Sequence, residues 1–94
     1  MSKTVNVSVQ VLPLHPQPYP IVDQAIAVIA ASGVKYEVGP LETTMEGDLD
    51  ELLDVAKAAH RACLSAGADK VVTLIKIADA VDGTTIEEKV SKYR

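Results

Sequence analysis

The clearest pattern in the chain is the alternation over residues 5–12, which predicts a β-strand. Every second position from residue 5 to residue 11 is valine, and Asn6, Ser8 and Gln10 face the opposite side. That opposite side is polar but uncharged. It is therefore either an ordinary solvated sheet face or the wall of a pocket or interface.

Further strands are predicted in the middle and toward the end of the chain. Two short extended runs, 34–38 and 41–45, are separated by Gly39-Pro40, which is typical of a β-hairpin. Residues 70–77 form a fourth strand that is largely apolar on both sides. We therefore expect both faces of this strand to be covered.

Two longer stretches have the 3.6-residue period of amphipathic helices. Four prolines make residues 13–20 a rigid connector, and the last of them, Pro20, suits the first turn of a helix over 21–32. The second helix begins at Asp48, an N-cap residue, and its apolar stripe continues to Gly67.

A short tail helix completes the pattern. Thr85 and Glu88 repeat the N-capping arrangement and start a charged helix of about eight residues. The order is thus strand, helix, strand, strand, helix, strand, tail helix. Both crossovers are expected to be right-handed and to return parallel, which a split βαββαβ arrangement satisfies. The length predicts a single domain over residues 1–94.

Composition and charge exclude several classes of partner. The net charge is −4 and the nine Lys and Arg residues are scattered, so we expect no nucleic-acid partner. The longest apolar run, Ala25–Ala31, is far shorter than the roughly 20 residues of a membrane span. The lone Cys63 and an N-terminus without an apolar signal core predict a cytoplasmic protein. A chain this short builds a modest core, which makes oligomerisation an open possibility.

Candidate chemistry is concentrated near the predicted hairpin. Glu46 has Thr44 on the same strand face, and the pair can recognise an amine or an aminopyrimidine through hydrogen bonds. The alternative is an exposed carboxylate at the end of a hairpin. His60 and Cys63 lack the companions of a metal site, so we interpret them as a half-buried histidine beside a core cysteine. No nucleophile elbow, phosphate loop or dinucleotide fingerprint occurs, and we expect neither metal nor cofactor.

Several segments keep an order and spacing found in a known family. Ser32-Gly33-Val34 precedes Tyr36-x-Val38-Gly39-Pro40-Leu41-x-Thr43, then Met45-Glu46-Gly47-Asp48 follows, and Ile75-Lys76-Ile77 stands near the end. Together with Val-x-Val and Pro13 near the N-terminus, they resemble the small thiamine-binding protein family, the YkoF-like proteins. The resemblance covers nearly the whole chain. It implies an α+β, ferredoxin-like βαββαβ sandwich with an antiparallel four-stranded sheet and helices on one face, to which the short C-terminal helix is added.

The resemblance also implies which residues touch a ligand. It assigns contacts to Tyr36, Thr43, Glu46 and Lys76, and a shape-setting role to the prolines and glycines of the motifs, namely Pro13, Gly39, Pro40 and Gly47. Our own interpretation adds two residues of the polar face of strand one and the threonine beside Glu46. The expected ligand-binding residues are therefore Ser8, Gln10, Tyr36, Thr43, Thr44, Glu46 and Lys76.

The sequence departs from the family pattern at two places. Thr44 stands where a more apolar residue is usual, and Ala78-Asp79-Ala80 replaces the charged ending that often follows Ile-Lys-Ile.

The function that follows from the resemblance is binding without turnover. We expect thiamine or its hydroxymethylpyrimidine part as the ligand of a homo-oligomer, a tetramer built as a dimer of dimers, with the site within one subunit or between two. One alternative is a structural or regulatory oligomeric module whose polar residues only stabilise interfaces. A third hypothesis is a small hydrolase or isomerase with Glu46 as base and His15 or His60 as acid.

Overall fold

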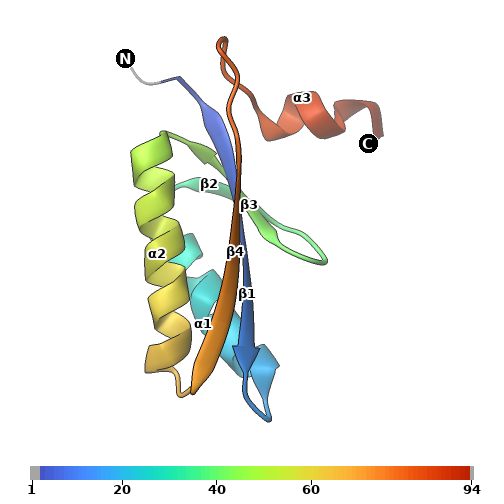
Figure 1. Cartoon of the computed structure of the whole chain (residues 1–94). Helices are drawn as coiled ribbons and strands as arrows, with labels where there is room; N and C mark the ends of the chain where they lie inside the picture. The colour runs from blue at the N-terminus through green and yellow to red at the C-terminus, as the bar shows by residue number, and fades with distance from the viewer. Residues whose placement is uncertain (1–2, 94) are drawn as a thin grey trace.

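The computed structural model describes residues 3–93 and contains the expected order of elements (Figure 1). A 3₁₀ helix over Ser91–Tyr93 continues the last helix. The predicted order, including the tail helix, is confirmed. The elements are β1 (Val5–Leu14), α1 (Pro18–Ala31), β2 (Lys35–Val38), β3 (Thr43–Gly47), α2 (Leu49–Ser65), β4 (Lys70–Ala78) and α3 (Ile86–Val90).

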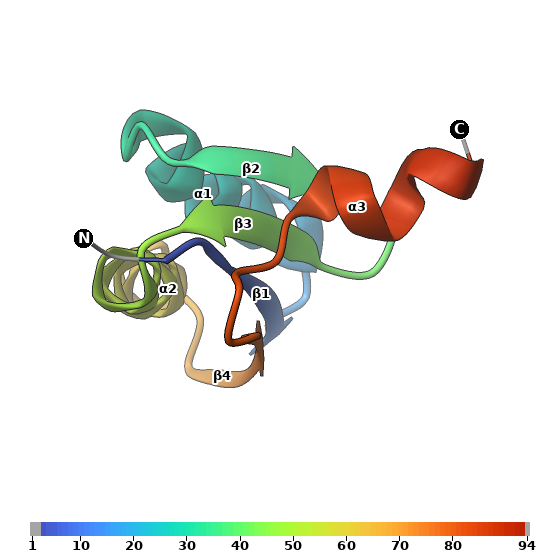
Figure 2. The same cartoon turned by 90° about the horizontal axis from the view of Figure 1, so that it is seen from above.

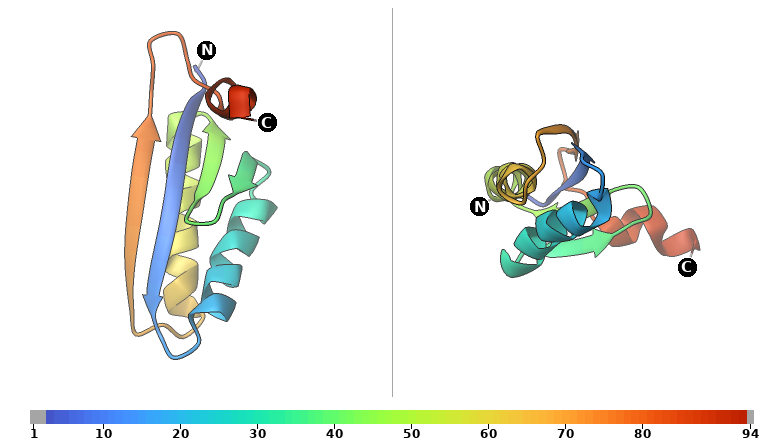
Figure 3. Two further views of the ribbon diagram at one scale, coloured as in Figure 1. Left: turned by 90° about the vertical axis from the view of Figure 1, so that its right-hand side faces the viewer. Right: turned by 90° about the horizontal axis from the view of Figure 1, so that it is seen from below.

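The four strands form one antiparallel sheet in the order β2-β3-β1-β4. The central strand β1 pairs with β3 over residues 5–9 and with β4 over residues 6–14. Helices α1 and α2 cover one face of the sheet, and α3 stands out from the other face (Figures 2 and 3). We call this second face the open face. The arrangement is the expected ferredoxin-like α+β fold.

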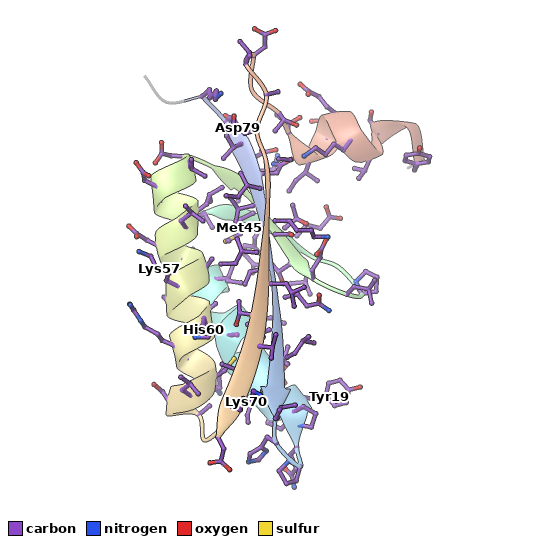
Figure 4. All side chains as sticks on the ribbon, viewed as in Figure 1. Tyr19, Met45, Lys57, His60, Lys70 and Asp79 are labelled. Atoms are coloured by element: carbon purple, nitrogen blue, oxygen red, sulfur yellow. The ribbon has the colours of Figure 1, made fainter. Side chains whose placement is uncertain are left out.

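The hydrophobic core lies between the sheet and the two long helices. Val7 of β1 and Met45 of β3 are paired in the sheet register, and neither has any exposed surface. Met45 lies on the helix side of the sheet (Figure 4). The period of 3.6 residues brings four residues of α2 into this core, and three residues of α1 join them. The buried helix residues are Ile21, Ala25, Ile29, Leu52, Ala56, Ala59 and Cys63.

Local capping signals fix where two helices begin. The Asp48 carboxylate accepts a hydrogen bond from the Glu51 N–H, with Oδ2 and N 3.2 Å apart. The Thr85 hydroxyl likewise accepts from the Glu88 N–H at 3.1 Å. Such caps satisfy backbone donors that a helix leaves unpaired in its first turn. Both predicted helix starts are confirmed.

The predicted connector over residues 13–20 is shorter than expected. Strand β1 continues through Pro13 to Leu14, and α1 begins already at Pro18. Proline is tolerated in β1 because β3 pairs with it only as far as Val9, so one side of the strand has no neighbour there. At the other end, Pro18 supplies the fixed φ of a first helical position.

Strand β4 has several partly exposed apolar side chains in the single chain. It lies at the edge of the sheet, and four of its apolar residues are 40–49% exposed: Val72, Leu74, Ile75 and Ile77. In the single chain α1 and α2 lie on one side of the sheet and β4 has one neighbouring strand, so cover of both faces requires a second copy and stays a prediction. Among residues 3–93, no helix combines the length and apolar character needed to cross a membrane.

Candidate binding site on the open face

The sheet register brings together five of the seven predicted ligand-binding residues. Ser8 of β1 pairs with Thr44 of β3 on one side and with Lys76 of β4 on the other. Because paired residues point to the same face, these three side chains form a row across the open face. Glu46 and Gln10 lie on the same face, since each is two residues from a member of this row.

Tyr36 and Thr43 lie on the opposite face. Tyr36 pairs with the core residue Met45, and Thr43 pairs with Val9. Thr43 is buried, whereas Tyr36 is 39% exposed at the edge of the sheet. The single chain therefore does not bring these two residues together with the other five. Tyr36 and Thr43 are nevertheless close in sequence to Thr44 and Glu46.

Two adjoining cavities lie on the open face, between α3 and the loop that joins β2 to β3. The β4-side cavity has a volume of about 280 Å³, and the hairpin-side cavity has a volume of about 320 Å³. Since both are lined by Asn6, Glu42, Thr44 and Lys89, we treat them as one feature, the open-face groove. Figures 1 and 3 show α3 and the β2–β3 loop projecting from this side of the sheet. The β4-side cavity is also lined by Ser8, Lys76, Ile77 and Ala78, and the hairpin-side cavity by Glu37, Gly39, Pro40, Leu41, Ile86 and Val90.

Ser8 carries an unsatisfied polar group at the floor of the groove. The residue is 7% exposed, and its buried hydroxyl has no hydrogen-bond partner among residues 3–93. A buried hydroxyl without a partner costs about 1–3 kcal/mol. Such groups are rare in folded proteins and call for an explanation.

An ion pair crosses β1 beside this hydroxyl. The Lys76 Nζ and Glu42 Oε2 atoms are 2.9 Å apart. Lys76 is the β4 partner of Ser8, whereas Glu42 immediately precedes Thr43, the β3 partner of Val9. The bridge therefore passes from one side of β1 to the other next to Ser8.

The carboxylate of Glu46 is engaged by protein groups on both oxygens. Oε1 accepts a hydrogen bond from the Ile86 N–H at 2.7 Å, and Oε2 is 3.1 Å from Lys35 Nζ. Burial tends to raise the pKa of Glu46, but the bonds from Ile86 and Lys35, the charge of Lys35 and a bond from Asn6 together lower it below its ordinary value. Glu46 thus holds the start of α3 against the sheet.

The segment around α3 is fixed by polar contacts, because α3 buries no residue. Lys89 donates a hydrogen bond from Nζ to Asn6 Oδ1. Upstream of the helix, the Thr84 N–H donates to the Thr4 carbonyl at 2.9 Å. Gly83 permits this approach, since it has a φ of +87° and an added Cβ would lie 3.3 Å from the Thr4 oxygen.

Three of the four residues that line both cavities were not predicted as site residues, namely Asn6, Glu42 and Lys89. Asn6 could have been found, because it shares the alternating face of Ser8 and Gln10. Glu42 could have been found by the same period of two, counted back from Thr44. Lys89 has no local signal, since its partner Asn6 is 83 residues away in the chain.

Within residues 3–93, Glu46 forms no acid–base pair of the kind that the hydrolase hypothesis requires. His60 lies on the helix side of the sheet, where its Nδ1 is 2.6 Å from Thr73 Oγ1, whereas Glu46 is on the open face. His15 follows the far end of β1 and accepts a hydrogen bond from the Gln17 N–H at 3.0 Å. His15 is nine residues from Asn6 along the chain, which is about 30 Å in an extended strand. Since Asn6 is the sheet partner of Glu46, His15 is far from that carboxylate.

The remaining part of the open face is apolar. Leu12 of β1 pairs with Val72 of β4, and Gln10 pairs with Leu74. Leu12, Leu14, Val72 and Leu74 are each exposed by 43–57%. We call these four residues the apolar patch. Gln10 lies between the patch and the groove.

Comparisons with known proteins place these observations in a family context. A family model described as thiamine-binding protein matches residues 7–94, which confirms the resemblance expected from the sequence motifs. A UPF0045 protein of Clostridium perfringens is 46% identical over 93 residues, which cover 97% of this chain and 98% of the relative.

Solved structures agree with that match. A Bacillus cereus domain of unknown function superposes with a TM-score of 0.95 at 52% identity, covering 99% of this chain and 92% of that one. A Thermotoga maritima protein with a suggested role in thiamine biosynthesis or salvage superposes with a TM-score of 0.89 at 41% identity, covering 97% and 99%.

Proposed function

Since the chain belongs to the thiamine-binding protein family, we propose that its open-face groove binds thiamine, or the hydroxymethylpyrimidine part of thiamine, without converting it. The observation that carries this proposal is the buried, unpaired hydroxyl of Ser8 at the floor of the groove. A ligand that forms a hydrogen bond with this hydroxyl removes the free-energy cost of leaving it buried and unpaired. The suggested role of the Thermotoga maritima relative in thiamine biosynthesis or salvage supports the same ligand class.

The hydroxyl groups of Ser8 and Thr44 suit an aminopyrimidine. They belong to directly paired residues, whose Cβ atoms are typically about 5 Å apart. Each hydroxyl can donate and accept a hydrogen bond, so the pair can match the amine and a ring nitrogen of one pyrimidine edge. Glu42 at the rim supplies a carboxylate for the positive charge of thiamine. In this proposal Glu46 acts indirectly, because its oxygens already hold α3 and Lys35.

Titration calorimetry with thiamine and with hydroxymethylpyrimidine tests this function. We expect both compounds to bind, and a hundredfold excess of ligand over Kd should stabilise the protein by about 2.7 kcal/mol in thermal melts. Ser8→Ala should weaken binding, whereas the matched control Ser65→Ala, at the exposed end of α2, should not. Absence of both heat and a melting shift with either compound would refute the proposal.

We further propose that the protein is a homo-oligomer, a tetramer assembled as a dimer of dimers, in which the apolar patch is covered by the patch of a second copy. The patch is self-complementary about a twofold axis because it is apolar throughout, and sheets commonly pack face to face in this way. The open edge of β4 adds unpaired backbone groups that a second strand can satisfy.

Light scattering tests the assembly. A solution mass of four times 10.0 kDa is expected, and a mass of 10.0 kDa would contradict it. If the oligomer forms but thiamine does not bind, the structural or regulatory module becomes the better account, since the patch by itself favours assembly.

A role in thiamine homeostasis or transport, and a cytoplasmic location, complete the proposed function. The location is supported by Cys63, which is a free and buried thiol, since a chain that uses no disulfide suits a reducing compartment.

A further inference from the structure

We propose that the β4-side cavity of the groove is an anion subsite that takes the phosphate group of a phosphorylated ligand, a phosphate monoester of thiamine. The subsite consists of Lys76, Lys89 and Ser8, three residues that line that cavity, and its binding groups are two amines and one hydroxyl. The inference rests on the proposed function for the pyrimidine part of the ligand, and it adds the chemical form that the site prefers.

Lys89 carries a charge that no carboxylate neutralises in an ion pair among residues 3–93. Its amine donates to Asn6 Oδ1, a neutral acceptor, and within the described part of the chain it forms no ion pair with a carboxylate. A lysine ammonium has three donors, so two remain for a ligand. This charge lies on the wall shared by both cavities.

Strand geometry places both lysines beside Ser8, in the lining of one cavity. Lys89 is held at Asn6, and Lys76 is the sheet partner of Ser8. Asn6 and Ser8 are two residues apart on one face of β1, so their Cα atoms are about 7 Å apart. A phosphate group between them can receive hydrogen bonds from both amines and from the Ser8 hydroxyl, and it thereby supplies the missing partner of that hydroxyl.

Charge is distributed unevenly along the groove. The β4-side cavity is lined by two amines and one carboxylate, whereas the hairpin-side cavity is lined by two carboxylates, Glu37 and Glu42, and one amine. A ligand with a cationic ring at one end and a phosphate at the other is complementary to this arrangement. When the phosphate binds Lys76, the carboxylate of Glu42 is released from its ion pair and can face the positive ring of the ligand.

Calorimetric titrations of thiamine and thiamine monophosphate test the subsite. We expect the monophosphate to bind about tenfold more tightly or better at low salt, and we expect this advantage to shrink at high salt because exposed charges are screened. Lys89→Gln should bring the ratio of the two affinities toward one. Lys57→Gln is the matched control, because Lys57 projects from α2 away from the sheet (Figure 4), and it should leave the ratio unchanged.

Glu42→Gln provides a test with the opposite sign. The variant frees Lys76 from its ion pair and removes the carboxylate that faces the positive ring of both ligands, so the affinity for thiamine should fall and the ratio of the monophosphate affinity to the thiamine affinity should rise. If thiamine binds and the two affinities are equal, or if Lys89→Gln weakens both ligands by the same factor, the anion subsite is refuted and the proposed function stands. If neither compound binds to the folded protein, the proposed function is refuted together with this inference.

Discussion

Replacement of Ser8 by alanine should change the free protein and its complex in opposite directions. The substitution removes one buried oxygen atom that has no partner among residues 3–93 and leaves the methylene group of the side chain in place. Most substitutions at a residue that is 93% buried destabilise a protein. Here we expect the reverse in the absence of ligand, because an unpaired buried hydroxyl is itself a penalty.

The size of both effects follows from that penalty. Removal of the hydroxyl should raise the free energy of unfolding by up to about 1–3 kcal/mol, and each kcal/mol raises Tm by about 4–8 °C in a domain of this length. In the complex, the same hydroxyl is paired in the wild-type protein and absent in the variant. The affinity for thiamine should therefore fall by about 1–3 kcal/mol, or roughly 5- to 150-fold.

Thermal melts with and without thiamine measure both effects in one experiment. Ser8→Ala should melt above the wild type without ligand and show a smaller upward shift when thiamine is added. Ser65→Ala should behave like the wild type in both conditions. A variant that melts below the wild type without ligand would refute the reasoning, because the hydroxyl would then already have a partner in the free protein, for example across a subunit interface.

Two further predictions concern α3 and the assembly. The pKa of Glu46 lies below its ordinary value of 4.5, so its ion pair and hydrogen bond stabilise the fold above about pH 4.5 and are lost as the pH falls through the lowered pKa. The protection of the Ile86 amide against hydrogen exchange, relative to its intrinsic rate at the same pH, should fall there and in Glu46→Gln. Unchanged protection would show that Glu46 does not hold α3. Leu74→Glu in the apolar patch should reduce the mass measured by light scattering. Leu64→Glu on α2 should not, although Leu64 (47% exposed) and Leu74 (46% exposed) are equally accessible. Equal masses for the two variants would show that the patch is not part of the interface.

The fold could be predicted because its signals are local. The capping residues Asp48 and Thr85 mark helix starts by contacts only three residues long. The alternation along β1 separates the core valines from the open face. The extent of β1 through Pro13 could not be predicted in this way, because proline is tolerated only where a neighbouring strand has ended, and that depends on the length of β3.

The candidate site was predicted where its signals are local and missed where they are not. Ser8 and Thr44 could be assigned to one face from the period of two within each strand. Thr43 was assigned to the site by the family resemblance, yet adjacent residues of a strand point to opposite faces, so Thr43 and Thr44 do not share one. The contact of Lys89 with Asn6 joins the two ends of the chain, and no pattern along the sequence indicates it.

The most direct test of the account is a crystal structure of the protein with thiamine bound. The account predicts a pyrimidine ring in the open-face groove, with a polar atom of the ring or its amine within hydrogen-bond distance of Ser8 Oγ. Thiamine bound away from the groove, or a groove in which the Ser8 hydroxyl stays unpaired beside the ligand, would contradict it.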